Sequence, residues 1–360
     1  MSWLVDLILV HILVLANIAD KLVRMDVSFK MTGVNKGFPQ PVVNFKADGQ
    51  ITYALVDTGA PYVFLVWKQW YENSHEDCKE FLFGCYECIP PCKQGPTKTY
   101  TFADHSAVSL FLHTGKLDFN GEVSTPLDFG LVAGFNRDPA TIWASLGLGP
   151  SDPSTAPYKS IVELLFTKKI ITGNSFSIYF TGGDDPSGQL ILGGDDPSKH
   201  AGPLSYVQIV NKDQGSIQVL GLTIGSDPNN TIAMEMPADL DTGTAHICFN
   251  RKFKSRVVAL LQSAGKKKVR IEDKGRYLSI SCPDALNLPS VTFFVKGVRG
   301  EKVPLVILAS SVVLMSQEDV CYICIIFDDA EEFTLGAIAF MGNYFHFDPE
   351  NNEVGLVSLQ

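Results

Sequence analysis

Two Asp-Thr-Gly motifs constrain the fold of this chain more than any other feature of its sequence. They are Asp57-Thr58-Gly59 and Asp241-Thr242-Gly243, one in each half. At ordinary residue frequencies, a chain of this length contains such a tripeptide about 0.1 times or less, so two copies are not expected by chance. An apolar segment precedes each motif, Tyr53–Val56 and Ala238–Leu240. Two copies of one strand-and-turn unit indicate two similar halves, and we expect the boundary near Gly202–Tyr206.

The rest of the pattern is mostly β. Short apolar runs bounded by Gly, Pro, Asp and Asn are typical of strands, and they occupy residues 51–56, 176–180, 190–192 and 291–295. Two amphipathic stretches, Tyr158–Leu165 and Arg251–Gln262, are expected to form short helices. We therefore predict a mainly β chain with two lobes, residues 20–203 and 204–360, and a ligand cleft between them.

Charge and the N-terminal sequence bear on partners and location. A formal net charge of -10 argues against nucleic acid, whose phosphates attract basic surfaces. The basic cluster Lys266–Arg270 is expected to be a solvated loop. The apolar run Leu4–Ala16 is too short to span a bilayer but has the length of a secretory signal, so residues 1–19 are expected to be a signal peptide. We expect a secreted or endolysosomal monomer without a stable membrane anchor.

The cysteines favour an oxidising compartment. Four lie in each half, which suits disulfides closed within each lobe: Cys78, Cys85, Cys88 and Cys92, then Cys248, Cys282, Cys321 and Cys324. The spacings Cys85-x2-Cys88 and Cys321-x2-Cys324 would also fit the two halves of a zinc site. The expected signal peptide favours disulfides, so we predict no metal.

The chain resembles the pepsin-like family of aspartic peptidases from about residue 40 onward. Besides the two motifs, the resemblance includes Leu146–Gly149, Ser187–Asp195 and Leu335–Asp348. It implies two β-barrel-like lobes that place Asp57 and Asp241 face to face across a peptide-binding cleft. The resemblance also assigns the loops around these carboxylates to Thr58, Gly59, Thr242, Gly243 and Thr244.

The activity that the resemblance implies is hydrolysis of peptide bonds at acidic pH, between bulky apolar residues. Two carboxylates a few ångströms apart cannot both ionise cheaply, so they share one proton, and aspartic peptidases are the standard example of this effect. One carboxylate takes a proton from water, which attacks the carbonyl, while the partner stabilises the oxyanion. The substrate is expected to bind in extended form. This chemistry requires no cofactor.

The flap, a hairpin that closes over the substrate in the family, departs from the usual pattern. Its match is Phe102-Ala103-Asp104-His105, where the family has Tyr-Gly, a small polar residue and Gly. Phe64 replaces the Trp whose indole hydrogen-bonds that Tyr, so both partners of one contact are absent together. Ala103 and His105 should stiffen the loop. Phe64 and Phe102 are expected to form an apolar wall of the substrate site.

Two further departures bear on activity. Ala60 replaces the usual Ser after the first motif and removes one donor to Asp57, whereas Thr244 keeps its counterpart, which predicts a shifted pH optimum. The short span between Ala19 and the first expected strand leaves little room for a prosegment. These departures leave an alternative open, a weak or inactive binding or inhibitor protein on the same fold.

The resemblance also bears on modification and disulfides. Cys282 and Cys321 match the disulfide that is usual in the second lobe, which leaves Cys248 and Cys324 as a further candidate pair, while the pairing in the first lobe stays open. Asn229 begins the glycosylation sequon Asn229-Asn230-Thr231 in a polar turn. His246, beside the second motif, is expected to be packed or on the surface and not in the cleft.

Overall fold

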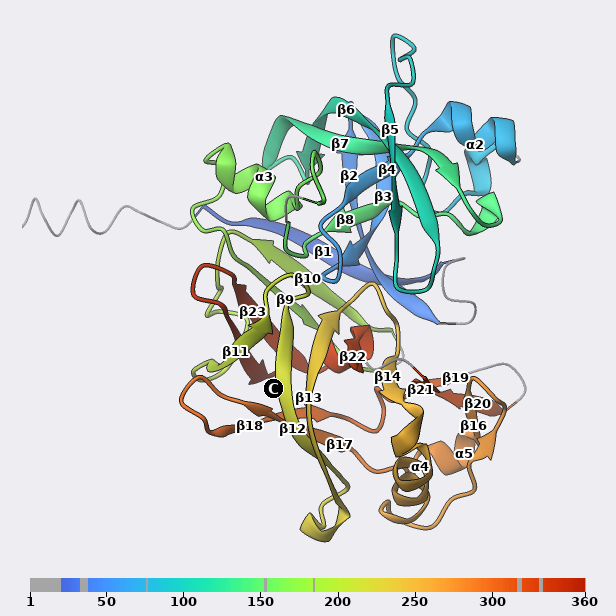
Figure 1. Cartoon of the computed structure of the whole chain (residues 1–360), viewed down its shortest axis with the longest axis vertical. Coiled ribbons are helices and arrows are strands. Elements are labelled where there is room, and N and C mark those ends of the chain that lie inside the picture. The colour runs from blue at the N-terminus through green and yellow to red at the C-terminus, as the bar shows by residue number, and fades with distance from the viewer. Residues whose placement is uncertain are drawn as a thin grey trace, which may run out of the picture.

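The two halves of the chain form two β-rich lobes, coloured blue to green above and yellow to red below in Figure 1. Of the described strands, twenty join in one continuous sheet and four form a separate small sheet. The prediction of a mainly β, bilobal fold is confirmed, while the boundary between residues 203 and 204 stays a prediction. The expected signal peptide lies outside the described residues. The computed structural model describes residues 21–32, 38–75, 77–151, 154–183, 185–315, 319–329 and 333–359.

Tight turns set the register of the upper lobe. Asp48 and Gly49 both have positive φ and form the two-residue loop between β2 and β3. Asn120 and Gly121 also have positive φ and begin the three-residue loop between β6 and β7. Asp-Gly and Asn-Gly are pairs that tight hairpin turns favour. The elements of this half are β1 (Val23–Met31), β2 (Pro39–Ala47), β3 (Gln50–Asp57), β4 (Val63–Val66), α2 (Lys68–Ser74), β5 (Thr97–Thr101), β6 (Ala107–Phe119), β7 (Val123–Phe135), β8 (Ser145–Gly147), α3 (Ile161–Thr167), β9 (Phe176–Phe180) and β10 (Ser187–Leu192).

The lower lobe encloses a cluster of fully buried rings, of which Phe249 lies 4.8 Å from Phe333 and 5.9 Å from Phe293, centroid to centroid. Its elements are β11 (Ser205–Asn211), β12 (Ser216–Ile224), β13 (Thr231–Asp241), β14 (Ile247–Asn250), α4 (Lys254–Ser263), β15 (Glu272–Asp273), β16 (Leu278–Ser281), α5 (Cys282–Ala285), β17 (Val291–Lys296), β18 (Lys302–Ile307), β19 (Val313–Met315), β20 (Val320–Ile323), β21 (Ile325–Asp328), β22 (Phe333–Gly336), β23 (Asn343–Asp348) and β24 (Glu353–Ser358).

Both expected helices are present, but each starts later than predicted. Ser160 caps α3 by accepting a hydrogen bond from the Glu163 amide, so the helix begins at Ile161 and not at Tyr158. This is an N-cap hydrogen bond, in which the Ser hydroxyl satisfies an amide of the first turn. Arg251–Phe253 forms a 3-10 turn capped by Asn250, and α4 follows it. Local hydrogen bonds at the caps thus set boundaries that periodicity alone misses.

The internal repeat predicted from the motifs is present in the strand pairing. β3 ends at Asp57 and pairs in parallel with β8, which places Asp57 opposite Gly147. β13 ends at Asp241 and pairs in parallel with β22, which places Asp241 opposite Gly336. A Cβ on Gly336 would lie 2.1 Å from the His246 carbonyl oxygen, and one on Gly147 would lie 2.4 Å from backbone atoms. Each Leu-Gly turn therefore needs its glycine for close packing against a motif loop.

Strands from both halves form one continuous section of the large sheet. β1 pairs with β10, β10 with β9, β9 with β23, β23 with β24 and β24 with β11. The Arg24 guanidinium also contacts the Asp196 carboxylate at 2.8 Å, between β1 and the segment after β10. The backbone hydrogen bonds of this section hold the two lobes together. Within the described part of the chain, no helix is long and apolar enough to cross a bilayer.

The disulfides agree with sequence analysis in part. The structure joins Cys282 to Cys321, the pair that the resemblance implies, and joins Cys78 to Cys85 and Cys88 to Cys92 in the upper lobe. The proposed pair of Cys248 and Cys324 is wrong, because both are free thiols. Cys248 lies opposite Ile326 in the β14–β21 pair, two positions from Cys324. That offset adds about 6.6 Å along the strand to the strand spacing, which exceeds disulfide reach.

Candidate active site

The two motif loops meet through a reciprocal set of hydrogen bonds. The Thr58 amide donates to Thr242 Oγ1 at 3.1 Å, and the Thr242 amide donates to Thr58 Oγ1 at 2.9 Å. Each hydroxyl donates onward to the opposite strand, Thr58 to the Leu240 carbonyl at 2.6 Å and Thr242 to the Val56 carbonyl at 2.7 Å. Both threonines are buried. The motif threonines therefore lock the two loops into one unit across the lobes.

The motif glycines allow each carboxylate to lie against the opposite loop. A Cβ added to Gly59 would lie 2.5 Å from Asp241 Oδ1, and one added to Gly243 would lie 2.7 Å from Asp57 Oδ1. Any side chain at either position would collide with a carboxylate. The structure thus brings together both predicted aspartates and all five predicted loop residues, because strand ends, threonines and glycines converge on one point.

The hydrogen bonds to the two carboxylates differ. The Gly59 amide donates to Asp57 Oδ1 at 3.0 Å, and the Gly243 amide donates to Asp241 Oδ1 at 2.8 Å. Thr244 Oγ1 donates a further bond to Asp241 Oδ2 at 2.7 Å. Ala60 occupies the corresponding position beside Asp57 and has no hydroxyl to donate. Asp241 therefore has one side-chain donor that Asp57 lacks.

Burial and proximity raise the proton affinity of the pair. Burial raises the pKa of the Asp57 carboxyl well above its usual value, and the negative charge of Asp241 raises it further. Burial also raises the pKa of Asp241, while hydrogen bonds from Thr244 and Gly243 oppose that rise. Like charges in a poorly solvated site favour the state in which the pair carries one proton.

The two carboxylates face a cavity of about 160 Å³ beneath the β5–β6 hairpin. The tip of this hairpin is the predicted flap. Three of its predicted residues, Phe102, Ala103 and Asp104, line the cavity with the dyad. The full lining is Leu55, Asp57, Gly59, Ala60, Phe102, Ala103, Asp104, Ser106, Trp143, Asp241, Gly243 and Thr244.

Side chains from the end of β7 tether the flap tip. Arg137 donates to the Asp104 carboxylate at 2.7 Å and also to the Asp104 carbonyl. Asn136 donates to the His105 carbonyl at 3.0 Å and accepts from the Ala107 amide at 2.7 Å. His105 has positive φ in this turn, a conformation that costs a non-glycine residue free energy. The tethers hold the hairpin over the cavity in this conformation.

The predicted aromatic wall differs in one residue. Phe64 is fully buried and is absent from the cavity lining, so its assignment to the substrate site is wrong. It lies behind the cavity wall, with its ring centroid 6.5 Å from that of Phe102 and 5.9 Å from that of Trp143. Trp143 lines the cavity instead, and sequence analysis missed it. No sequence signal places it there, because its contact with the flap arises from tertiary packing.

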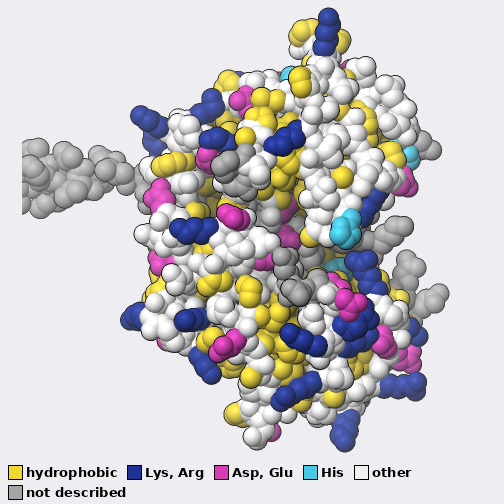
Figure 2. All heavy atoms as spheres, in the orientation of Figure 1, with side chains coloured by type: hydrophobic (Ala, Val, Ile, Leu, Met, Phe, Trp, Pro, Cys, Tyr) yellow, Lys and Arg dark blue, Asp and Glu magenta, His cyan; other side chains and the backbone are white. Residues whose placement is uncertain are grey.

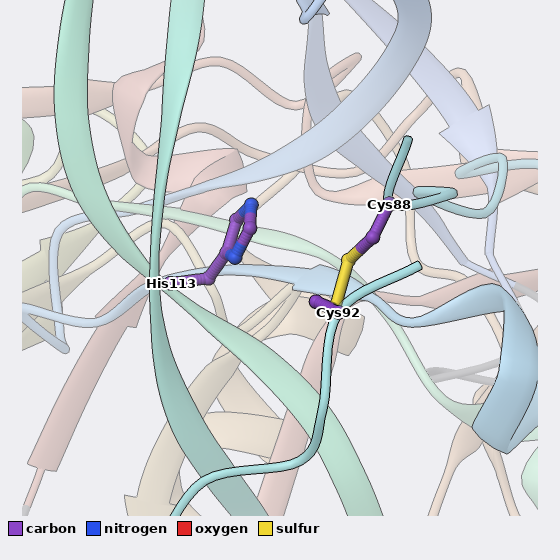
Figure 3. Close-up of side chains that lie close together, drawn as sticks. All are labelled: Cys88, Cys92 and His113. Carbon is purple, nitrogen blue, oxygen red and sulfur yellow. A yellow bond between two sulfur atoms is a disulfide. The ribbon is translucent and has the colours of Figure 1, made fainter. Parts of the chain in front are cut away.

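A cluster of potential metal ligands lies outside the dyad cavity. Cys88 and Cys92, in the segment before β5, approach His113 of β6 (Figure 3). One atom from each residue lies within 4.8 Å of the others. The two sulfurs are bonded to each other, so while that bond is intact they offer no thiolate to a metal. The two Cys-x2-Cys spacings do not form the zinc halves considered from sequence, because Cys85 and Cys321 are bonded elsewhere.

Other residues singled out from sequence lie away from the cavity. His246 is 2% exposed and packs against Phe38, with ring centroids 4.1 Å apart. Asn229 is exposed in the turn before β13, and its glycosylation stays a prediction. Basic side chains on the face shown in Figure 2 are interspersed with acidic ones and form no continuous patch there.

Paired Asp-Thr-Gly loops on a bilobal β framework define the pepsin-like class of folds. The chain belongs to the eukaryotic aspartyl protease family, whose model matches residues 47–359.

Individual relatives are distant. The chain is 25% identical to renin of Echis ocellatus over 223 residues and 25% identical to pepsin A of Sus scrofa over 221 residues, and each alignment covers 59% of this chain. These alignments cover 52% and 53% of the two relatives, so the chain spans about half the length of the curated relatives it matches. Rhizopuspepsin-2 of Rhizopus niveus is 27% identical over 277 residues, which cover 74% of this chain and 66% of the relative.

Proposed function

We propose that this protein is an aspartic endopeptidase in which Asp57 and Asp241 share one proton and activate a water molecule. The observation that carries the proposal is the reciprocal locking of the two loops, with each carboxylate held against the opposite glycine. A binding protein does not need two poorly solvated carboxylates so close together, because their repulsion destabilises the fold. A shared proton removes that repulsion and provides an acid and a base in one site.

The proposed chemistry follows from the protonation of the pair. The ionised carboxylate takes a proton from water as the oxygen attacks the scissile carbonyl, and the protonated partner donates to the developing oxyanion. The proton belongs to the pair, so we assign no fixed acid or base before substrate binds. The amine leaves with a proton returned from the dyad. The raised pKa values of both carboxyls favour retention of a proton by the pair, and we expect cleavage at acidic pH.

The proposed substrate is an extended peptide beneath the flap. The β5–β6 hairpin covers the cavity, and a peptide segment can add to a hairpin edge through its backbone. Leu55, Ala60, Phe102 and Trp143 make much of the lining apolar. Cleavage between bulky apolar residues, in a secreted or endolysosomal compartment that supplies acid, fits this lining. The proposed active form is a monomer.

A peptide-binding protein without catalysis is the second candidate, and one observation favours it. Arg137 and Asn136 tether the flap tip, whose two usual glycines are replaced by Ala103 and His105. A lid that opens slowly limits turnover more than it limits binding. The intact hydrogen bonding of both motifs favours the enzyme.

The test is digestion of unfolded globin between about pH 2.5 and about pH 6.5. Wild type, Asp57→Asn and wild type with pepstatin are compared in the same buffers. We expect cleavage by wild type only. A folded wild-type sample that binds pepstatin and cleaves nothing in this range would instead establish the peptide-binding protein.

A further inference from the structure

The indole of Trp143 is an unusual component of the dyad cavity. Trp143 lines this cavity together with Asp57 and Asp241. Its side chain is buried, with 5% of the residue exposed, yet Nε1 has no hydrogen-bond partner among the described residues. An indole nitrogen can only donate a hydrogen bond, and buried Trp normally finds an acceptor.

Three phenylalanines hold the indole in this orientation. Its ring centroid lies 5.1 Å from that of Phe102, 5.8 Å from that of Phe135 and 5.9 Å from that of Phe64, with interplanar angles of 67°, 85° and 60°. Such edge contacts are favourable, so the ring cannot turn to another acceptor without losing them. Ring faces accept hydrogen bonds only weakly, so these neighbours do not replace a true acceptor.

A donor left without an acceptor in a buried site destabilises the protein, and more than about 90% of buried polar groups are paired. Here the donor belongs to a residue that borders the space where a substrate would bind. We propose that Trp143 is a specificity-determining residue whose Nε1 pairs with an acceptor on the substrate. The inference rests on the proposed function.

The cavity also indicates the chemical class of the side chain that Trp143 selects. Leu55, Ala60 and Phe102 supply apolar surface around the indole. The matching side chain is therefore compact or flat and carries a hydrogen-bond acceptor. Tyrosine meets this description relative to phenylalanine, and asparagine meets it relative to the equally sized leucine. The position concerned flanks the scissile bond, because the same cavity holds both carboxylates.

Ser145 provides a matched control. Its Oγ is also buried and without a partner among the described residues, but Ser145 is absent from the cavity lining. Ser145→Ala removes a second unpaired polar group, two residues after Trp143 in the sequence. Its effect on selectivity between the paired peptides should be negligible.

The test is a double-mutant cycle between protein and peptide. Two peptide pairs differ only beside the scissile bond, Tyr against Phe and Asn against Leu. The protein is wild type, Trp143→Phe, or a variant with β-(3-benzothienyl)alanine at position 143, which keeps the ring volume and removes the donor. The ratio of kcat/KM within each pair is compared between proteins. The same peptides with a reduced, uncleavable bond are used to measure Kd.

We expect the acceptor-bearing peptide to lose between about 5-fold and about 150-fold relative to its partner when the donor is removed. The loss should appear in kcat/KM and in Kd for at least one pair. A ratio that stays within about twofold of wild type for both pairs would overturn the inference. Kd is measured without turnover. If the peptides bind but are not cleaved, the proposed function is wrong, and the Kd ratios alone decide the inference.

Discussion

The two motif loops have the same backbone plan but differ at one side chain. Both carry a Thr that crosses to the opposite loop and a Gly against which the other carboxylate packs. After the glycine, the first loop has Ala60 and the second has Thr244, which donates to Asp241 at 2.7 Å. The framework is therefore symmetric, while the donors to the carboxylates are not.

This difference shows that the two properties of the site have separate causes. Position is fixed by backbone and threonine hydrogen bonds that the loops share. Proton affinity is set by burial, which raises both pKa values, and by Thr244, which opposes the rise at Asp241 alone. Variants of the loops should therefore change geometry and protonation independently.

The largest expected effect comes from removing either carboxylate. Asp57→Asn and Asp241→Asn should each lower kcat by at least about 10³-fold, because the remaining carboxyl has no partner with which to share a proton and cannot be acid and base at once. If the two act as one unit, the double variant should lose little more than either single variant. Steady-state kinetics on one peptide, with folding checked by circular dichroism, would measure this. If the fold losses in kcat of the two single variants multiply in the double variant, the two carboxylates act independently.

The next effect concerns the symmetric framework. Thr58→Ala and Thr242→Ala each remove two buried hydrogen bonds and orphan an amide on the opposite loop. Each should lower the free energy of unfolding by about 2–4 kcal/mol, and the two values should agree within about 1 kcal/mol. Urea denaturation would measure both. Thr58→Ser and Thr242→Ser keep the hydroxyl and serve as controls. A several-fold difference between the two alanine variants would refute the symmetry.

A smaller effect on stability follows from the raised pKa of Asp57. The folded protein holds this proton more tightly than the unfolded chain, whose carboxyl has a pKa near 3.8. The contribution of this proton to the free energy of unfolding is fully present below that pH and is lost as pH rises through the folded-state pKa of Asp57. Asp57→Asn lacks this loss, so it should be more stable than wild type at neutral pH by on the order of 1–2 kcal/mol, with no difference at about pH 3.

The control for that experiment is an exposed acid. Asp329 pairs with Arg251 at the surface. Asp329→Asn should change the free energy of unfolding by less than about 0.5 kcal/mol at either pH. Equal stability of wild type and Asp57→Asn at neutral pH would contradict the tight proton binding.

The smallest effect is expected from variants of the two side chains that distinguish the loops. Ala60→Ser adds a donor beside Asp57, favours the ionised carboxylate and should move the pH optimum of cleavage down. Thr244→Ala removes a donor to Asp241 and should move the optimum up. Both variants should keep kcat/KM within about tenfold of wild type, because the framework is untouched. Shifts in the same direction would show that these side chains do not control the proton.

Sequence alone predicted the parts that repeat. Two identical tripeptides after apolar strands indicated two similar β lobes, and the family resemblance implied that Asp57 and Asp241 face each other. Both predictions rest on motif residues that make the contacts themselves. Trp143 and Arg137 belong to no repeat. Their contacts arise only when the β7 end and the segment before β8 meet the flap in three dimensions.

Two predictions from the sequence were wrong, and each depended on where a single strand residue lies in the folded protein. Phe64 stands at a position that the family pattern connects to the flap, but strand burial places its ring behind the cavity wall. The Cys248–Cys324 pair failed because strand register offsets the two residues. Register and side-chain depth depend on tertiary packing, which residue spacing does not record.

The pH profile of kcat/KM on a single peptide, from about pH 2.5 to about pH 6.5, tests the shared proton most directly. The dyad predicts a bell with both limbs in acid, one for each proton of the pair, and no activity in Asp57→Asn. A rate that rises steadily toward neutral pH, or a folded and inhibitor-binding protein without cleavage at any pH, would contradict it.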